Sequence, residues 1–180
     1  DRSQQVDIEK LCDRRFGIGA DGLILLQNKA GYDFEMIYFN ADGRESTMCG
    51  NGGRCIVSFA KQLGIIEEKA FFWAIDGALE AIINPAGTYV ELKMQDVAAI
   101  HEVGNDYVLN TGSPHYIQFV PALGAVDVEK SGRAIRNSES FLADGINVNF
   151  VEVSGTCLRI ATYERGVEGE TLACGTGVTA

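Results

Sequence analysis

The sequence lacks several features that would place it in common functional classes. No apolar run approaches the roughly 18–20 residues of a bilayer-spanning helix, and no basic-then-apolar segment opens the chain. The 15 basic residues are scattered among 25 acidic ones, for a formal net charge of -10. Nucleic acids and anionic lipids attract clustered positive charge, so we expect neither nucleic acid nor membrane as a partner. The sequence favours a soluble cytoplasmic protein with a small polar ligand.

Cysteine is present, but not in the patterns of disulfide frameworks or zinc sites. No Cys-x-x-Cys pair occurs among the five cysteines, Cys12, Cys49, Cys55, Cys157 and Cys174. An odd number without regular spacing disfavours a disulfide framework. The two histidines, His101 and His115, are far in sequence from any cysteine pair, whereas structural zinc sites use closely spaced ligands. We therefore expect no metal.

The first half of the chain predicts a hairpin, a helix and further strands. Apolar or alternating runs at 22–28 and 32–40 flank a turn-prone stretch and indicate a β-hairpin. A broad apolar face between Ile56 and Leu63, followed by Gly64, predicts a helix that begins near Gly50 to Gly52. Three more strands are expected at 71–76, 78–84 and 88–94.

The second half predicts a similar set of elements. The pattern loosens over 96–105, and strands are expected at 106–110, 115–120, 146–153 and 157–163, with a short helix near 126–137. Cys174 should open another helix, which would need about a dozen residues to be stable. We expect its remaining turns to lie beyond Ala180. The sequence thus predicts an α/β (α+β) fold of two similar lobes, 1–96 and 97–180, that arose by duplication.

Two stretches of the chain are almost alike, ESTMCGNGGR at 45–54 and ETLACGTGVT at 170–179. A cysteine at a helix N-terminus lies beside unpaired N–H groups and the positive end of the helix dipole, which favour the thiolate. The following glycines let a carboxylate or phosphate approach those N–H groups. Two such corners across a cleft would supply a base on one face of a carbon and an acid on the other. Inversion of a stereocentre requires this arrangement.

Other interpretations of the cysteines remain. A cysteine outside a disulfide is most often a small buried hydrophobe, which is what we expect of Cys12, Cys55 and Cys157. A phosphatase-like loop is disfavoured, because Arg54 follows Cys49 too soon and no arginine follows Cys174. A redox pair between the two corner cysteines is a further alternative, since oxidation could bridge them.

Seven motifs span nearly the whole chain, namely FGIGADG 16–22, FNADG 39–43, MCGNGGRC 48–55, GSPH 112–115, NVNF 147–150, ERG 164–166 and GETLACGTG 169–177. In this order they resemble the successive signatures of the diaminopimelate epimerase family. The resemblance implies two pseudo-symmetric α/β lobes, each with a mixed, mostly antiparallel sheet wrapped around a central helix, and an active site between them. It also implies cofactor-independent interconversion of LL- and meso-2,6-diaminopimelate in bacterial lysine and peptidoglycan synthesis.

The resemblance implies roles for individual residues. Cys49 and Cys174 match the cysteines that act as base and acid, and His115 and Glu164 match groups that tune their protonation. Arg165 is suited to a bidentate carboxylate contact. The positions that match substrate-binding groups are Asn40, Gly50, Asn51, Ser113, Asn147, Glu164, Arg165, Gly175 and Thr176. The resemblance implies neither metal nor cofactor, and a homodimer is one option for the assembly.

The chain departs from the family pattern at several places. Ser113 stands where asparagine is usual, Gly22 where many members carry glutamine, and ERGVEGET is one residue longer than the commoner form. The family's opening segment, with its asparagine, has no counterpart here.

Two alternative functions remain. A proline or hydroxyproline racemase of the same fold typically reads Met-Cys-Gly-His at the first corner, so Asn51 and the ERG…GET run favour diaminopimelate. A catalytically silent binding lobe is the other alternative, and the presence of both corner cysteines disfavours it.

Overall fold

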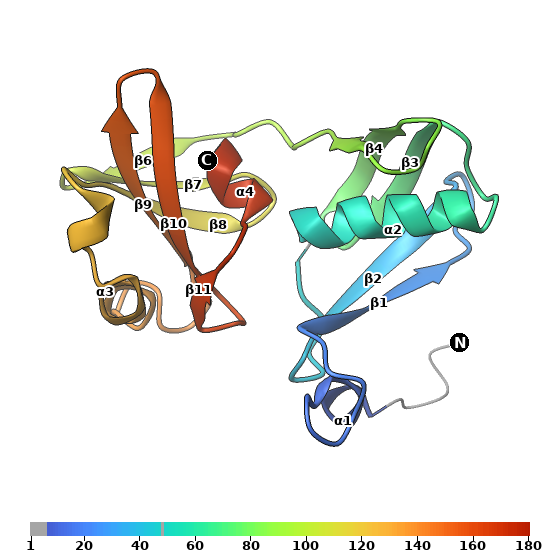
Figure 1. The fold of residues 1–180 in the computed structure, drawn as a ribbon, viewed down its shortest axis with the longest axis horizontal. Coiled ribbons are helices and arrows are strands. Elements are labelled where there is room, and N and C mark those ends of the chain that lie inside the picture. Colours follow the sequence, from blue (N-terminus) through green and yellow to red (C-terminus); the bar gives the residue numbers. More distant parts are fainter. Residues whose placement is uncertain (1–6, 48) are drawn as a thin grey trace. The chain divides into compact units, whose positions relative to one another are not determined.

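The protein is described here by a computed structural model that covers residues 7–47 and 49–180 (Figure 1). The chain divides into two compact units, Asp1–Lys93 and Met94–Ala180, each with its own sheet and buried core. In each unit one parallel pair of strands, joined through a helix, is flanked by antiparallel neighbours. Met48 of the first cysteine motif lies outside the described residues.

The first unit is a five-stranded sheet with one long helix across one face (Figure 1). The strand order is β1-β2-β3-β4-β5, and only the β2–β3 pair, which α2 connects, is parallel. Its described elements are α1 (Ile8–Cys12), β1 (Gly22–Gln27), β2 (Phe34–Asn40), α2 (Gly50–Gln62), β3 (Lys69–Ala74), β4 (Gly77–Ile83) and β5 (Val90–Leu92).

Local signals place α2 where the sequence predicts it. Its apolar side buries Ile56, Val57 and Ala60 against the sheet, where Phe34 and Phe72 stack with ring centroids 4.8 Å apart. The helix ends because Gly64 adopts a φ of +70°, which residues other than glycine rarely adopt. Its N–H and that of the next residue cap the last carbonyls of the helix, at 2.9 and 3.0 Å.

The second unit is a six-stranded sheet in the order β11-β10-β9-β8-β7-β6, in which only β8 and β9 are parallel. The connection between these two strands contains α3. The elements of the unit are β6 (Ile100–Val103), β7 (Asp106–Asn110), β8 (Pro114–Phe119), η1 (Leu123–Ala125), α3 (Val128–Arg136), β9 (Asn147–Ser154), β10 (Cys157–Glu164), β11 (Gly169–Thr171) and α4 (Gly175–Thr179).

The two faces of the second sheet differ because side chains alternate along each strand. Helix α3 packs on the face that carries Val148, Phe150 and Tyr163. The opposite face carries an apolar group of Leu109, Ile117 and Val151, against which Ala180 packs at the end of α4. The turn that contains Cys174 therefore lies on the face opposite to α3.

The repeated cysteine corner is also a repeat in structure. In the first unit Phe39 forms an antiparallel bridge with Glu45, and in the second Tyr163 of β10 pairs with Glu170 of β11. In both corners the glutamate four residues before the cysteine returns the chain to the preceding strand. A helix then begins directly after the cysteine. This repeat confirms the predicted pair of similar α/β lobes.

Four of the described elements were not predicted, namely α1, β6, η1 and β11. Strand β6 was missed because all four of its residues are exposed, so its sequence has no alternation of apolar and polar positions. Strand β11 lies in a stretch that the sequence presents as a loop, and it forms through its pairing with β10. The five-residue α1 is too short for a periodic signal, and β5 is shorter than the strand expected at 88–94.

Replacing Gly132 by alanine should destabilise the second unit. A methyl group there would lie 2.4 Å from Cβ of the buried Tyr163, in the contact between α3 and β10. Overpacking of this kind costs about 1–3 kcal/mol, which exceeds the helix-propensity gain of up to about 1 kcal/mol. Gly124→Ala is the control, because that site has no atom within 4 Å among the described residues. Equal urea midpoints for the two variants would contradict the expected clash.

Candidate active site

The first cysteine corner joins the end of β2 to α2. Cys49 is the N-cap of α2 in extended conformation, and its carbonyl accepts the first helical hydrogen bond from Gly53 N–H at 2.7 Å. The glycine three residues after the cysteine lies close to the hairpin, since a Cβ at Gly52 would be 2.9 Å from Ile24 Cδ1. The first turn of α2 thus rests directly on the hairpin strands.

The second corner has the same construction. Cys174 is the buried, extended N-cap of α4, and its carbonyl accepts from Val178 N–H at 3.0 Å. Its Sγ lies 3.5 Å from Thr176 Oγ1. A Cβ at Gly177 would lie 2.3 Å from Asn149 Oδ1. At the second glycine of each Gly-x-Gly, side chains of the sheet approach the backbone closely, where the sequence had predicted the approach of a ligand.

The structure confirms that both cysteines sit at helix N-termini, and it places them in different units. Asn40, Gly50 and Asn51 accompany Cys49 in the first unit. The predicted residues in the second unit lie where β8 and β9 begin and where β10 ends. This group comprises Ser113, His115, Asn147, Glu164, Arg165, Cys174, Gly175 and Thr176.

In the first unit the backbone of Asn40 closes the turn after β2. Its N–H donates to the carbonyl of Arg44 at 2.9 Å, and its carbonyl accepts from Gly43 N–H at 3.0 Å. Gly22 pairs opposite Asn40, and a Cβ at Gly22 would lie 2.4 Å from the Phe39 carbonyl oxygen. A longer side chain does not fit there. In α2 the guanidinium of Arg54 donates to Asn51 Oδ1.

Asn147 joins three of the strand ends in the second unit. Its Nδ2 donates to Ser113 Oγ at 2.8 Å and to the carbonyl of Pro114 at 3.1 Å, while its Oδ1 accepts from the backbone N–H of Arg165 at 2.9 Å. The side chain is buried. A contact from Asn147 to a substrate would therefore use the second lone pair of Oδ1. Ser113 serves here as the partner of Asn147.

Arg165 is oriented by the loop that precedes β9. Its Nη1 donates to the carbonyl of Asp144 at 3.0 Å, and its aliphatic stem lies over Gly145, where a Cβ would be 2.8 Å from Arg165 Cδ. Gly145 has a φ of +70°. Arg165 is half-buried.

The extra residue of ERGVEGET is absorbed in an ordered turn. Glu168 has a φ of +58°, unusual for a residue other than glycine, and its N–H donates to the carbonyl of Glu164 at 2.8 Å. Its carboxylate accepts from Arg136 Nε at 3.1 Å and from Gly166 N–H at 3.2 Å. These contacts hold the turn beside Arg165.

His115 is completely buried at the start of β8. Burial, and then the charge of Arg165, lower the pKa of His115 from 6.5 to about 4. The imidazole is therefore neutral near pH 7. Its Nδ1 lies 2.9 Å from Nδ2 of Asn149, a residue that the sequence analysis did not single out.

The signal that could have identified Asn149 is in the motif NVNF. Its two asparagines are two positions apart, so they share one face of β9, in the part of the strand that is buried. A buried polar side chain in such a place needs hydrogen-bond partners. Thr111 and Thr162 were also missed. Thr111 Oγ1 donates to the carbonyl of Thr176 at 2.8 Å and so ties the Cys174 turn to the end of β7.

The structure describes all five cysteines, and none of them forms a disulfide. The expectation of a buried thiol holds for Cys12 but is wrong for Cys55 and Cys157, which are exposed. Cys55 lies on the side of α2 that faces away from the sheet, and Cys157 follows the turn between β9 and β10.

Two absences concern the part of the chain that the structure describes. There, no group of three or more His, Cys, Asp or Glu side chains could hold a metal ion. Over the same residues, no helix has both the length and the apolar character to cross a membrane.

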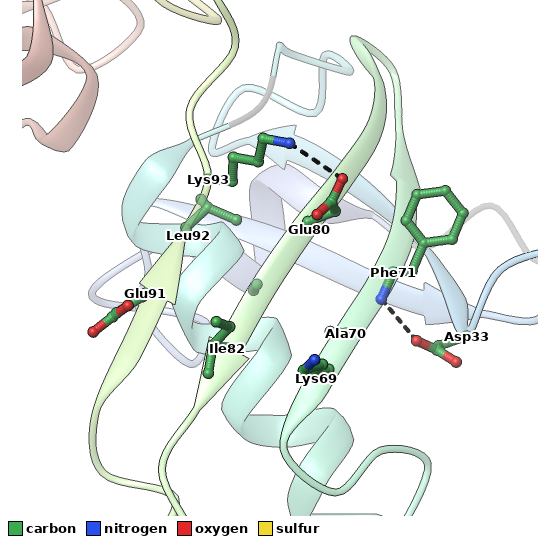
Figure 2. Close-up of a pocket in the computed structure, with 10 residues that line it drawn as sticks. Asp33, Lys69, Ala70, Phe71, Glu80, Ile82, Glu91, Leu92 and Lys93 are labelled. Atoms are coloured by element: carbon green, nitrogen blue, oxygen red, sulfur yellow. Dashed lines mark hydrogen bonds and ion pairs between the residues drawn. The ribbon is translucent and has the colours of Figure 1, made fainter.

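A pocket of about 610 Å³ lies elsewhere, on the face of the first sheet opposite to α2 (Figure 2). Its polar contacts are the Lys93–Glu80 ion pair at 3.3 Å and the hydrogen bond from Phe71 N–H to Asp33 at 2.7 Å. None of the predicted site residues lines this pocket.

Comparison with known proteins identifies the family. The family model for diaminopimelate epimerase matches residues 2–100 and 107–180. Diaminopimelate epimerases from Flavobacterium psychrophilum and Aquifex aeolicus are 55% and 42% identical to the chain, over 96% and 99% of its length. The chain belongs to the diaminopimelate epimerase family. It spans 68% of the length of each of these two relatives.

Family membership confirms the function that the motifs predicted. Diaminopimelate epimerases are isomerases with a small-molecule substrate, and the epimerase function is that of this family. The two cysteine corners therefore belong to a chain whose family epimerises an amino acid.

Solved structures of related fold support the architecture. A PhzF-family phenazine biosynthesis protein from Bacillus anthracis matches with a TM-score of 0.65 and 14% identity, over 88% of this chain and 63% of that one. A hydroxyproline epimerase from Agrobacterium vitis, with trans-4-hydroxy-L-proline bound, matches with a TM-score of 0.60 and 16% identity, over 86% and 57%. At such identities the likeness shows the fold alone, and it confirms the predicted α+β class.

Proposed function

We propose that this protein interconverts LL- and meso-2,6-diaminopimelate with Cys49 and Cys174 as its base and acid. The observation that supports the pairing is that both cysteines are N-caps of helices in corners of the same construction, one in each unit. Neither Cys55 nor Cys157 occupies such a position.

The reaction needs one thiolate and one thiol. The thiolate removes the proton from the α-carbon, and the thiol delivers its own proton to the opposite face of the same carbon. One carbon–hydrogen bond breaks and another forms, no electrons are gained or lost, and the two sulfurs exchange protonation states. The protein is then set for the reverse direction. This mechanism requires the two sulfurs to lie on opposite faces of the α-carbon.

The backbone around each cysteine would stabilise the charge that develops. The N–H groups of Gly50 and Asn51, and of Gly175 and Thr176, follow the cysteines in the first helical turns and can donate to the substrate carboxylate at the reacting centre. As the proton leaves, negative charge spreads onto that carboxylate. Donors placed there stabilise the transition state more than the substrate.

The distal polar ends of diaminopimelate would be held by side chains of both units. Arg165 would pair with a carboxylate through two N–H groups, from the orientation that Asp144 and Gly145 impose. Asn40 and Asn147 would bind polar groups of the substrate. Ser113 would contribute through Asn147, to which its Oγ is hydrogen-bonded.

His115 and Glu164 would tune the protonation of the thiols. Because His115 is neutral near pH 7, it would act there as a hydrogen-bonding group, without a positive charge. Glu164 lies at the end of β10, directly before Arg165. We further propose that the protein works in the bacterial cytoplasm, and that a homodimer is the assembly to test first.

The test is to incubate the full-length protein with LL-diaminopimelate in deuterated water. We expect the isomer ratio to approach equilibrium while the product carries deuterium at the inverted α-carbon, because the delivered proton comes from a thiol that exchanges with solvent. Parallel reactions with L-proline and trans-4-hydroxy-L-proline are the controls. Exchange of either of these, with none into diaminopimelate, would replace the proposal by a racemase of the same fold.

A further inference from the structure

A fully buried polar cluster lies behind the turn that carries Cys174. Asn149 of β9, His115 of β8 and Thr162 of β10 share the face of the second sheet opposite to α3. Strand register brings them together: Asn149 pairs directly with Thr162, and His115 pairs with the residue two positions before Asn149. Buried polar groups of this kind are expected to be hydrogen-bonded with defined donors and acceptors.

The hydrogen bonds of Asn149 determine the orientation of its amide. Thr162 Oγ1 donates to Asn149 Oδ1 at 2.8 Å. On the other side, Nδ2 lies 3.3 Å from the carbonyl oxygen of Tyr116, which can only accept. The group that faces this carbonyl must therefore be the NH₂, because a reversed amide would place its oxygen against the carbonyl oxygen and lose that hydrogen bond.

The amide in turn determines the tautomer of His115. The same Nδ2 lies 2.9 Å from His115 Nδ1, so Nδ1 is the acceptor and carries no proton. A neutral imidazole bears its single proton on the other nitrogen, Nε2. In the described part of the chain this buried Nε2 has no hydrogen-bond partner. It is a donor that an acceptor in the site, such as a thiolate or a carboxylate, would satisfy.

Asn149 also contacts the Cys174 turn. Its Oδ1 lies against Gly177, where a Cβ would be 2.3 Å from that oxygen and 3.3 Å from Cys174 Sγ. The position of the Cys174 turn and the protonation pattern of His115 therefore depend on one side chain. Asn149 itself is completely buried.

We propose that Asn149 is a positioning residue that holds His115 as the Nε2–H tautomer beside the Cys174 turn. The importance of Asn149 for catalysis rests on the proposed function. The tautomer of His115 does not depend on that function. Asn149 would act through His115 and the turn, without touching the reacting atoms. The tautomer ensures that the imidazole offers a hydrogen, and not a lone pair, from Nε2.

The first test is the tautomer in the unmodified protein. The chain has only two histidines, so protein labelled with ¹⁵N at histidine gives two ring systems, and His101→Gln assigns them. Long-range ¹H–¹⁵N spectra near pH 7, recorded without substrate, separate proton-bearing from bare ring nitrogens. We expect His115 to carry its proton on Nε2. A proton on Nδ1 would overturn the proposal whether or not the protein epimerises diaminopimelate.

The second test replaces Asn149 by aspartate, which has nearly the same shape but, when ionised, donates no hydrogen bond. The oxygen that then faces His115 requires a proton on Nδ1, so the tautomer should switch, and kcat should fall by about tenfold or more with diaminopimelate. Asn137→Asp is the matched control, because it adds the same charge at an exposed position after α3, on the other side of the sheet. An unchanged His115 spectrum in folded Asn149→Asp would contradict the proposal. If that variant does not fold, the tautomer of the unmodified protein decides.

Discussion

Cys49→Ala and Cys174→Ala should each lower the rate of diaminopimelate epimerisation by at least about 10²–10⁴-fold, the range that a positioned acid or base contributes. Either substitution removes one of two groups that act on opposite faces of the α-carbon, and no other side chain of the same corner can take its place. The rate losses of the two single variants should not add in the double variant. A protein that lacks one thiol already cannot complete the inversion, so the double variant should be about as slow as either single variant.

The exposed cysteines supply controls for this experiment. Cys55 lies in the same helix as Cys49 but on its solvent side, and Cys157 lies at the start of β10. Cys55→Ala and Cys157→Ala should keep the rate of the unmodified protein. Circular dichroism should show all four variants folded, since alanine fits the extended N-cap positions without strain. Turnover retained by either corner variant would rule out the two-thiol mechanism.

The second unit should lose stability as the pH falls from 6.5 towards 4, because of His115. In the unfolded chain this histidine takes up a proton near its ordinary pKa of 6.5, whereas in the folded unit burial lowers the pKa to about 4. Below pH 6.5 the unfolded state therefore binds more protons than the folded state, and acid favours unfolding. At about 1.4 kcal/mol per pKa unit the full effect is on the order of 3 kcal/mol.

Urea unfolding at pH 7 and at pH 4 measures this effect. Other groups also titrate in this range; the backbone N–H of Leu123 lowers the pKa of Glu152, for example. The informative comparison is therefore between the unmodified protein and His115→Gln, in how strongly the free energy of unfolding depends on pH. The variant should show a flatter dependence. His101→Gln, at an exposed position on β6, should behave like the unmodified protein. Equal dependence in all three proteins would exclude His115 as the source.

The acid destabilisation also bears on the cluster around Asn149. If His115 is neutral and carries its proton on Nε2, acidification adds the second proton at Nδ1, where Asn149 now donates. That hydrogen bond would be lost, so the buried cluster and the Cys174 turn should loosen together. Proteolysis or hydrogen exchange at 174–180 would detect this loosening in the same pH range as the loss of stability.

Elements with strong local signals could be predicted from the sequence. The hairpin β1–β2 follows from alternation around a turn, and α2 follows from its apolar face with glycine at its end. Strand β6 could not be predicted in this way, because no residue in it is buried. Strand β11 depends on a partner in β10, so its three residues contain too little pattern of their own.

The candidate site shows the same division. The two cysteine corners could be recognised because each is a contiguous motif. The start of a helix depends on residues that are neighbours in the sequence. The roles of glycine within them were only half recognised. At Gly52 and Gly177 a Cβ would lie 2.3–2.9 Å from side-chain atoms of the strands, and no local pattern indicates which atoms these are.

The sequence by itself determined the family, the two-lobed α+β fold and the pair of cysteines at helix N-termini, because each follows from contiguous motifs and local patterns along the chain. Only the tertiary structure decided which ring nitrogen of His115 carries the proton and which contacts hold the Cys174 turn. His115 and Asn149 are 34 residues apart and meet because β8 and β9 pair in parallel with one particular register. A shift of that register by one residue would turn Asn149 to the other face of the sheet. The tautomer is therefore a property of the strand register.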